Sequence, residues 1–182
     1  MNTTPIPVPA ALDRIRVILS HPSHPGNIGA AARAMKTMGL SRLVLVNPRA
    51  FPDARADAMA AGATDLLVQA EVVPSLAQAL SGTVLAVAMT ARRRELAVPA
   101  LWARDGAAEL VATAATGDVA LVFGNETSGL SNDELAMCRR WAMIPVNPDF
   151  SSLNLAAAVQ VMSYELRLAA LDPGLNSPAM TR

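Results

Sequence analysis

Short apolar runs alternate along this chain with longer alanine-rich segments. Five runs rich in Val, Ile and Leu are each ended by Ser, Asn, Thr or Gly. Continuous apolar runs of this length are typical of strands that are buried on both faces of a sheet. The predicted strands are Ile15–Leu19, Leu43–Val46, Val84–Met89, Val119–Phe123 and Ala142–Val146.

The segments between these runs have helical spacing. The predicted helices cover residues 28–38, 54–61, 75–80, 107–115, 131–139 and 153–170. Strands that alternate with helices predict an α/β fold, in which a parallel sheet carries helices on both faces. We expect Asn27 to be the N-cap of the first helix and Gly39 to end it as the C′ residue. The spacing of Ser131 and Glu134 predicts a capping box.

The length and apolar content predict one domain. The chain has 182 residues, 52% of them hydrophobic, which is enough for a substantial core. We expect a flexible N-terminus over residues 1–13, the domain over 14–171 and a flexible tail over 172–182, because both ends are rich in proline. The segment 90–102, TARRRELAVPALW, is the candidate for a mobile internal linker.

The charge and the cysteine content of the chain bear on its partners and on its cellular compartment. The formal net charge is zero, so no overall positive field indicates a nucleic-acid partner. Of the 15 basic residues only Lys36 is a lysine, which suits bidentate phosphate contacts, although GC-rich codon usage explains the bias equally well. The single cysteine, Cys138, excludes an internal disulfide and favours the reducing cytoplasm. No stretch is typical of a signal peptide or a membrane span.

The stretch HPSHPGNIGAAAR, residues 21–33, joins the first predicted strand to the first predicted helix. Gly26 and Gly29 permit close backbone approach, and the start of a helix offers unpaired N–H groups to an anion. Gly29, Arg33 and Lys36 share one helix face, so we expect room for a ligand above Arg33. An ordinary solvated helix face remains the alternative.

A metal ion or a dinucleotide could also bind a glycine-containing loop between a strand and a helix, but this sequence fits either ligand less well. His21 and His24 lack a third ligand at metal spacing, so we expect no metal site. A dinucleotide is disfavoured because the spacing G-x-x-G-x-x-A departs from the full fingerprint. In addition, the second strand ends at Asn47-Pro48, where a ribose-binding acid would be expected. A Rossmann-type oxidoreductase is therefore the weaker alternative.

Two further strand ends lead into polar loops. In ALVFGNETSGLSNDEL, residues 120–135, a buried strand runs directly into Gly124 and Glu126. Such a strand end exposes backbone groups at the sheet edge where α/β proteins bind ligands. In IPVNPDFSSLNLAAAVQVMSYEL, residues 144–166, Ser151 and Ser152 precede a long helix, and both serines could be simple N-caps.

Together the three segments resemble the motifs of the SpoU branch of the SPOUT RNA methyltransferases, most closely its TrmJ-type tRNA 2′-O-methyltransferases. The resemblance covers residues 14–170 and rests on GNIGAAARAMKTMGLSRLVLVNP, LVFGNETSGLS and IPVNPDFSSLNLAAAVQVMSYE. It implies transfer of a methyl group from S-adenosylmethionine to a ribose 2′-hydroxyl of RNA, with position 32 of the tRNA anticodon loop as the expected target. It also implies a C-terminal deep trefoil knot and a homodimer with the cofactor loops near its interface.

The resemblance assigns roles to individual residues. The expected catalytic residues are Arg33, Asn27, Glu126, Ser152 and Asn154. The expected cofactor-binding residues are Met89, Thr90, Ala91, Gly124, Ile144, Ser151, Ser152 and Leu153. Arg33 is also expected to bind RNA with Arg92, Arg93 and Arg94, an arginine cluster that a solvated loop would equally explain. A phosphate track could extend further to Arg14, Arg42 and Arg49.

Chemistry leaves two roles open for Arg33. A free guanidinium has a pKa of about 12 or more and is a poor base at pH 7. Arg33 could bind an RNA phosphate and stabilise the developing alkoxide, or it could lose its proton in a dry complex. We favour the first role, because the second must overcome several pKa units.

Two departures from the family pattern bear on specificity. Asn125 stands where the TrmJ type commonly has arginine or another residue, and Phe150 stands where a tyrosine is common. Either change could alter which nucleotide is chosen. A knotted RNA-binding protein without catalysis is the other alternative, and the presence of Asn27, Arg33 and Glu126 disfavours it.

Overall fold

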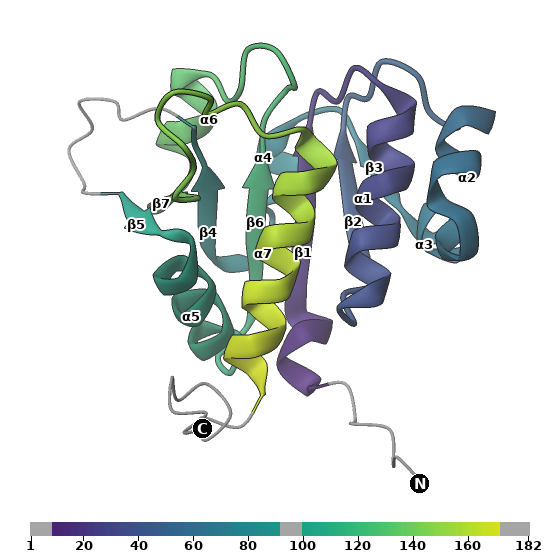
Figure 1. The fold of residues 1–182 in the computed structure, drawn as a ribbon. Helices are drawn as coiled ribbons and strands as arrows, with labels where there is room; N and C mark the ends of the chain where they lie inside the picture. Colours follow the sequence, from purple (N-terminus) through teal and green to yellow (C-terminus); the bar gives the residue numbers. More distant parts are fainter. Residues whose placement is uncertain (1–8, 92–99, 172–182) are drawn as a thin grey trace, which may run out of the picture.

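The computed structural model describes residues 9–91 and 100–171 (Figure 1). In these residues the strands form one parallel sheet in the order β3-β2-β1-β6-β4-β7-β5. The strands are β1 Ile15–Ser20, β2 Arg42–Val46, β3 Glu71–Val73, β4 Thr83–Met89, β5 Leu101–Trp102, β6 Asp118–Phe123 and β7 Arg140–Met143. The predicted parallel α/β sheet is confirmed.

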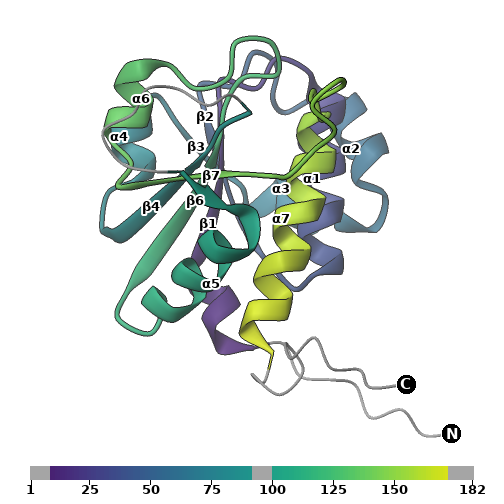
Figure 2. The same cartoon turned by 60° about the vertical axis from the view of Figure 1, so that its left-hand side comes forward.

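Helices cover both faces of the sheet, as predicted. Helices α1, α2, α5 and α7 lie on one face, and α4 and α6 lie on the other (Figures 1 and 2). The helices are η1 Ala10–Arg14, α1 Pro25–Thr37, α2 Ala54–Ala60, η2 Ala61–Ala63, α3 Thr64–Gln69, α4 Leu76–Ala79, α5 Ala103–Thr113, α6 Asn132–Ala136 and α7 Leu155–Ala170, with η1 and η2 of the 3-10 type.

Two apolar cores lie on either side of the sheet. Val17 and Leu19 of β1 point into the larger core, which includes residues of α1, α5 and α7. Ile18 points the other way, into a smaller core with Leu135 of α6 and Trp141 of β7. Because side chains alternate between the faces of a strand, covering both faces requires apolar residues at every position. This explains the continuous apolar runs in the sequence.

The predicted strands differ from the observed ones in the bounds of β7 and in the two edge strands. The last strand was expected over Ala142–Val146 but spans Arg140–Met143. Pro145 has no N–H to donate to a neighbouring strand, so the pairing stops before it. The strands β3 and β5 were not predicted, because edge strands of three and two residues leave no apolar pattern.

Helix α5 begins at Ala103, whereas the sequence predicted a start at residue 107. Gly106, a poor helix former, interrupts the pattern there. Its role is packing, since a Cβ on Gly106 would lie 3.0 Å from the Cβ of Ala142 in β7. Helix α3 was not predicted either.

The predicted caps have different outcomes. Asn27 is not the N-cap of α1, because the helix begins earlier, with His24 as N-cap and Pro25 at its first position. The fixed φ of proline suits that position. Gly39, with φ +85°, follows the C-cap Met38 as predicted. The capping box of Ser131 and Glu134 is also confirmed.

The ordered domain begins before residue 14. Residues 10–14 form η1, and Leu12 within it is fully buried, so part of the expected flexible N-terminus belongs to the core. The predicted linker 90–102 ends in strand β5. Residues 1–8, 172–182 and the predicted RNA-binding residues Arg92, Arg93 and Arg94 lie outside the described residues. Within the described ranges, no helix has the length and apolar character needed to span a membrane.

Candidate functional site

The carboxyl ends of three neighbouring strands, β6, β4 and β7, lead into loops that enclose a cavity of about 350 Å³. We call it the first cavity. All eight residues predicted to bind the cofactor line it, namely Met89, Thr90, Ala91, Gly124, Ile144, Ser151, Ser152 and Leu153. Segments far apart in the sequence therefore meet at one site, although their cofactor role stays a prediction. Lining residues that sequence reasoning missed include Thr127, Ser128, Val146 and Ala158.

The loop after β6 is a tight turn whose shape depends on two glycines. The N–H of Gly129 donates to the carbonyl of Asn125 over 2.9 Å. A Cβ on Gly124 would lie 2.3 Å from the carbonyl carbon of Gly129, so no other residue fits at this position. Gly129 itself has φ +67°, in the left-handed region that favours glycine. This geometry brings the backbone of residues 124–130 along the cavity wall.

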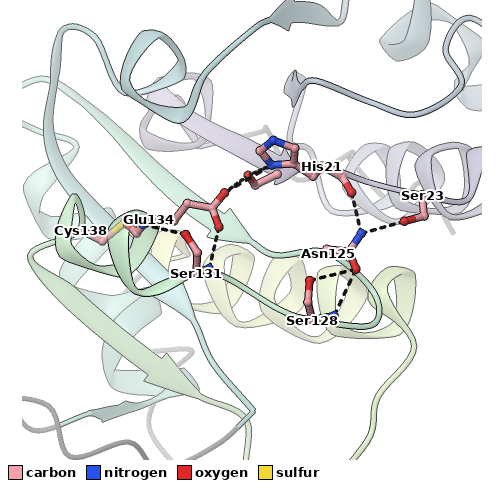
Figure 3. A network of polar contacts seen from close by, with 8 residues as sticks. His21, Ser23, Asn125, Ser128, Ser131, Glu134 and Cys138 are labelled. Atoms are coloured by element: carbon pink, nitrogen blue, oxygen red, sulfur yellow. Dashed lines mark hydrogen bonds and ion pairs between the residues drawn. The ribbon is translucent and has the colours of Figure 1, made fainter.

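The side chain of Asn125 ties this turn to the loop after β1 (Figure 3). Its Nδ2 donates to the carbonyl of His21 over 2.8 Å and to the Oγ of Ser23 over 2.7 Å. Its Oδ1 accepts from the N–H groups of Thr127 and Ser128 at 2.9 and 3.1 Å. An asparagine can do both because its amide carries donors and an acceptor. The sequence marked Asn125 only as a departure from the family pattern.

The carboxylate of Glu126 binds the start of α1. It accepts from the N–H of Ser23 at 2.8 and 3.1 Å, from the N–H of His24 at 3.1 Å and from Nδ2 of Asn27 at 3.3 Å. Burial alone would raise the pKa of Glu126, but these donors, beginning with Ser23, lower it below its usual value. Glu126 is therefore a paired anion that orders the loop between β1 and α1.

Asn27 and Asn154 extend this contact to α7. Asn154 is the N-cap of α7, and its Oδ1 accepts from the N–H groups of Ala156 and Ala157 at 2.9 and 3.3 Å. Its Nδ2 donates to the Oδ1 of Asn27 over 3.1 Å. Because Asn154 is the cap, the alternative in which Ser151 and Ser152 serve as N-caps is wrong. Three of the predicted catalytic residues, Asn27, Glu126 and Asn154, thus form one connected network, with Ser152 in the adjoining cavity wall.

Arg33 lies apart from this network. It is exposed on α1 and is not among the residues that line the first cavity. The room for a ligand above Arg33 was expected because Gly29, one turn earlier, has no side chain, but α2 packs directly on Gly29 and fills this space. A Cβ on Gly29 would lie 2.0 Å from the carbonyl oxygen of Ala56. The glycine serves helix packing, and Lys36 on the same helix face pairs with Asp65 over 2.9 Å.

The suggested extension of the phosphate track is wrong for two of its three arginines. Arg14 and Arg42 lie at the amino ends of β1 and β2, at the edge of the sheet opposite to the first cavity. Arg14 donates to the carbonyl of Ala114 over 3.2 Å, and Arg42 donates to Asp118 over 2.9 Å. Arg49 alone lies at the carboxyl edge, where its side chain is exposed.

A second polar cluster lies between the end of β1 and α6, next to the turn after β6 (Figure 3). Glu134 accepts hydrogen bonds from the Oγ of Ser20 and, over 2.7 Å, from the N–H of Ser131. Nδ1 of His21 lies 3.5 Å from the same carboxylate. Burial would raise the pKa of Glu134, yet Ser20, Ser131 and His21 lower it overall. Burial and then the nearby charge of Glu134 raise the pKa of Cys138 to about 12.

The chemistry of the first cavity is mostly that of backbone and hydroxyl groups. Among the lining residues that the structure describes, Glu126 is the one that carries a charge. A negative side chain favours a neutral or cationic ligand over a second anion. No group of three or more His, Cys, Asp or Glu side chains in the described ranges could hold a metal ion.

The sequence of this chain is similar to that of known methyltransferases. A tRNA (cytidine/uridine/adenosine-2′-O-)-methyltransferase TrmJ from Pseudomonas aeruginosa (strain UCBPP-PA14) is 55% identical over 159 residues, which are 87% of this chain and 62% of that protein. The chain thus spans about three fifths of that relative's length.

Two solved structures superpose on the chain. A probable methylase family protein from Haemophilus influenzae Rd KW20 has a TM-score of 0.85 and 45% identity, covering 94% of this chain and 71% of that one. The SpoU methyltransferase AviRb from Streptomyces viridochromogenes, in complex with AdoMet, has a TM-score of 0.67 and 25% identity, covering 85% of this chain and 60% of that one.

The model of the SpoU rRNA Methylase family matches residues 14–164. This range contains β1, the turn of residues 124–130 after β6, and the loop before α7 that lines the first cavity. By sequence and by fold, this chain belongs to the SpoU rRNA methylase family.

Proposed function

We propose that the protein is an S-adenosylmethionine-dependent RNA methyltransferase that modifies a ribose 2′-hydroxyl of tRNA. The observation that carries the proposal is the meeting of eight predicted cofactor residues, from three separate loops, in the first cavity. The Pseudomonas relative is by name a tRNA 2′-O-methyltransferase, and AviRb is a SpoU methyltransferase with AdoMet bound. Position 32 of the anticodon loop remains the expected target.

The first cavity fits this cofactor in size and chemistry. Its volume of about 350 Å³ lies in the range of small-ligand pockets. Backbone groups after β4, β6 and β7 can hydrogen-bond an adenine and a methionyl tail, and Ile144 and Leu153 provide apolar contacts. The single negative charge of Glu126 suits a sulfonium. When bound, S-adenosylmethionine supplies an electrophilic methyl group.

The residues of the chain then act by positioning. Methyl transfer is an in-line displacement, so its rate depends on how well the ribose hydroxyl is held. Glu126, Asn27 and Asn154 fix the start of α1 relative to the first cavity through hydrogen bonds of 2.8 to 3.3 Å. Ser152 lines the cavity and offers a hydroxyl. Arg33, exposed and outside the cavity, is suited to an RNA phosphate and to stabilising the alkoxide.

Three further properties belong to the same proposal. We infer a homodimer, a C-terminal trefoil knot and a cytoplasmic location from the family resemblance. The dimer is supported by large apolar side chains beside the cavity, since Phe150 is 79% exposed and Leu153 is 41% exposed. The knot rests on the family resemblance alone. The cytoplasmic location is supported by the free cysteine Cys138.

The assignment of Arg33 is tested by the variant Arg33→Ala. We expect methyl transfer to unmodified tRNA to be abolished, because the RNA phosphate and the alkoxide lose their cation. Binding of S-adenosylmethionine, measured by calorimetry, should persist because Arg33 does not line the first cavity. Retained turnover in this variant would contradict the role of Arg33.

The same calorimetry separates the alternative functions. An RNA-binding protein without catalysis would show no heat on addition of S-adenosylmethionine. A nicotinamide oxidoreductase would bind NAD, which the negative Glu126 and the absence of an acid at Asn47-Pro48 disfavour. Comparing ribose methylation of tRNA from cells with and without the gene would identify the nucleotide, and an unchanged position 32 would contradict the expected target.

A further inference from the structure

A second cavity, of about 390 Å³, lies at the carboxyl edge of the sheet. The turn after β6, residues 124–130, separates it from the first cavity. We call it the His21 cavity, after the one aromatic ring among its lining residues. Its walls include Pro74, Leu76, Glu134 and Met137, and it shares Ser128 and Gly129 with the first cavity. The turn between residues 128 and 129 is therefore a common wall, and ligands in the two cavities would be neighbours.

The backbone of His21 is held in a conformation that L-residues rarely adopt. Its φ is +53°, in the left-handed region. Its N–H donates to the carbonyl of Val46 over 2.8 Å, and its own carbonyl accepts from Nδ2 of Asn125 over 2.8 Å. Strain of this kind persists only where the surroundings enforce it, and it concentrates at functional sites. Here it fixes the ring at the cavity wall.

The hydrogen bonds of the ring decide what His21 can offer a ligand. The single hydroxyl proton of Ser20 is donated to Glu134, so Ser20 can only accept from Nδ1 of His21, 3.0 Å away. Nδ1 therefore carries the proton, and in the neutral ring Nε2 is an acceptor. Within the described parts of the chain, Nε2 makes no hydrogen bond, and the side chain is 50% exposed.

The remaining walls favour a flat, partly apolar ligand. Both oxygens of Glu134 are already bonded to Ser20 and Ser131, so the cavity offers no free carboxylate to a cation. Pro74, Leu76 and Met137 give apolar surface, and Met137 is 47% exposed. Apolar walls that cover the face of a base, together with one fixed acceptor at its edge, suit a nucleobase that carries an amino group.

A cation for the attached phosphate lies on the adjoining loop. The N–H of Arg49 donates to the carbonyl of Pro22 over 3.0 Å, which anchors Arg49 next to His21. Its guanidinium is exposed and makes no hydrogen bond or ion pair with the residues that the structure describes. The amino-edge arginines Arg16 and Arg42, in contrast, both pair with Asp118. Arg49 is thus free to bind a phosphate.

We propose that the His21 cavity binds an unpaired nucleotide of the RNA substrate, adjacent to the one that is methylated. The base packs with its face against Leu76 and Met137 and donates an amino hydrogen, edge to edge with the His21 ring, to Nε2, and Arg49 binds the phosphate. Adenine and cytosine carry such an amino group, and uracil does not. The inference rests on the proposed function for the identity of the RNA, whereas the nucleotide site itself is defined by the cavity.

Kinetics with unmodified tRNA made by in vitro transcription test this site. Asparagine tolerates a positive φ, so His21→Asn removes the ring and keeps the backbone. We expect the KM for tRNA to rise at least about fivefold, with kcat at saturating tRNA and the affinity for S-adenosylmethionine unchanged. Arg49→Ala should also raise KM, and Arg14→Ala, which removes an exposed arginine at the amino edge, should not. An unchanged KM in His21→Asn would overturn the proposal.

A binding measurement distinguishes failure of this proposal from failure of the proposed function. The chain has only two histidines, so the NMR signals of the His21 and His24 rings can be assigned by comparison with His21→Asn. Cytidine 5′-monophosphate should shift the signals of His21 and leave those of His24 in place, and uridine 5′-monophosphate should shift them less. If no RNA is methylated but this pattern holds, only the proposed function fails. If neither nucleotide shifts His21, or both shift the two rings equally, the proposed site is wrong.

Discussion

The amino ends and the carboxyl ends of the strands form two edges of the sheet, which we call the amino edge and the carboxyl edge. Both edges carry arginine and acidic residues, but these residues make different contacts. At the amino edge, Asp118 lies between Arg16 at 3.2 Å and Arg42 at 2.9 Å, so both guanidinium groups are engaged in ion pairs. At the carboxyl edge, Glu126 is paired with backbone N–H groups instead, and Arg49 is exposed. Arg16 and Arg42 at the amino edge are therefore held in ion pairs, whereas Arg49 at the carboxyl edge is available to a ligand.

This difference indicates that residues at the amino edge mainly stabilise the fold, whereas residues at the carboxyl edge bind ligands. Charges that pair with each other hold neighbouring strands together and have little left for a ligand. A carboxylate that binds backbone donors fixes loops in place and leaves the arginines unpaired. Both cavities lie at the carboxyl edge, where ligands of parallel α/β proteins bind. Substitutions at the two edges should therefore have separable effects.

The largest effect is expected for Gly124→Ala at the carboxyl edge. The added Cβ would lie 2.3 Å from backbone atoms of Gly129 and Leu130, so the turn must open. We expect the free energy of unfolding to fall by about 3 kcal/mol and the heat of S-adenosylmethionine binding to disappear. Denaturant unfolding and calorimetry measure the two losses.

The matched control is Gly62→Ala. A Cβ at Gly62 meets no atom within 4 Å, so stability and cofactor binding should stay at the wild-type level. Equal behaviour of the two alanine variants would show that the turn after β6 does not depend on close packing.

A smaller effect is expected for Glu126→Gln. The amide cannot accept as strongly from Ser23, His24 and Asn27, so the free energy of unfolding should fall by about 1.5 kcal/mol at pH 7. The pKa of Glu126 is lowered in the folded state, so its carboxylate stabilises the fold above the ordinary glutamate pKa of about 4.3. This contribution is lost as the pH falls through the lowered value.

The difference between Glu126→Gln and the wild type should therefore shrink in acid. Urea unfolding at a series of pH values from 7 downward measures it. A difference that stays constant down to pH 3 would mean that the charge of Glu126 contributes nothing to the fold.

The smallest effect is expected for Asp118→Asn at the amino edge. The pKa of Asp118 is lowered, first by its hydrogen bond from Arg42, so its charge stabilises the fold at neutral pH. Because the side chain is 30% exposed, solvent screens the pair, and we expect a loss of about 1 kcal/mol. Both kcat and KM for tRNA should be unchanged. A change in kcat would show that the two edges are coupled.

Periodicity in the sequence was enough to predict the parallel sheet and the five longer strands, because strands buried on both faces must be apolar throughout. It could not reveal β3 and β5, whose pairing depends on neighbours far along the chain. The eight cavity residues came from the family resemblance, and the pattern alone indicated only the strand ends. The contact of α2 with Gly29 left no local signal, since it depends on how two helices pack.

The hydrogen-bond networks of the site could not be predicted from the sequence either. The glycines of the turn after β6 were visible in the sequence, but the partners of Glu126 were not, since they lie about 100 residues away along the chain. The strained backbone of His21 depends on Val46 at the end of β2 and on Asn125 in the turn after β6. Local propensity describes neither kind of contact.

The buried thiol of Cys138 makes the natural protein convenient for site-specific labelling. With a pKa of about 12, it forms almost no thiolate at neutral pH and is nearly inert to maleimides. A cysteine introduced at an exposed position, such as Arg55→Cys on α2, would therefore be the reactive thiol. Fluorophores or spin labels could then follow docking of tRNA without first replacing the native cysteine.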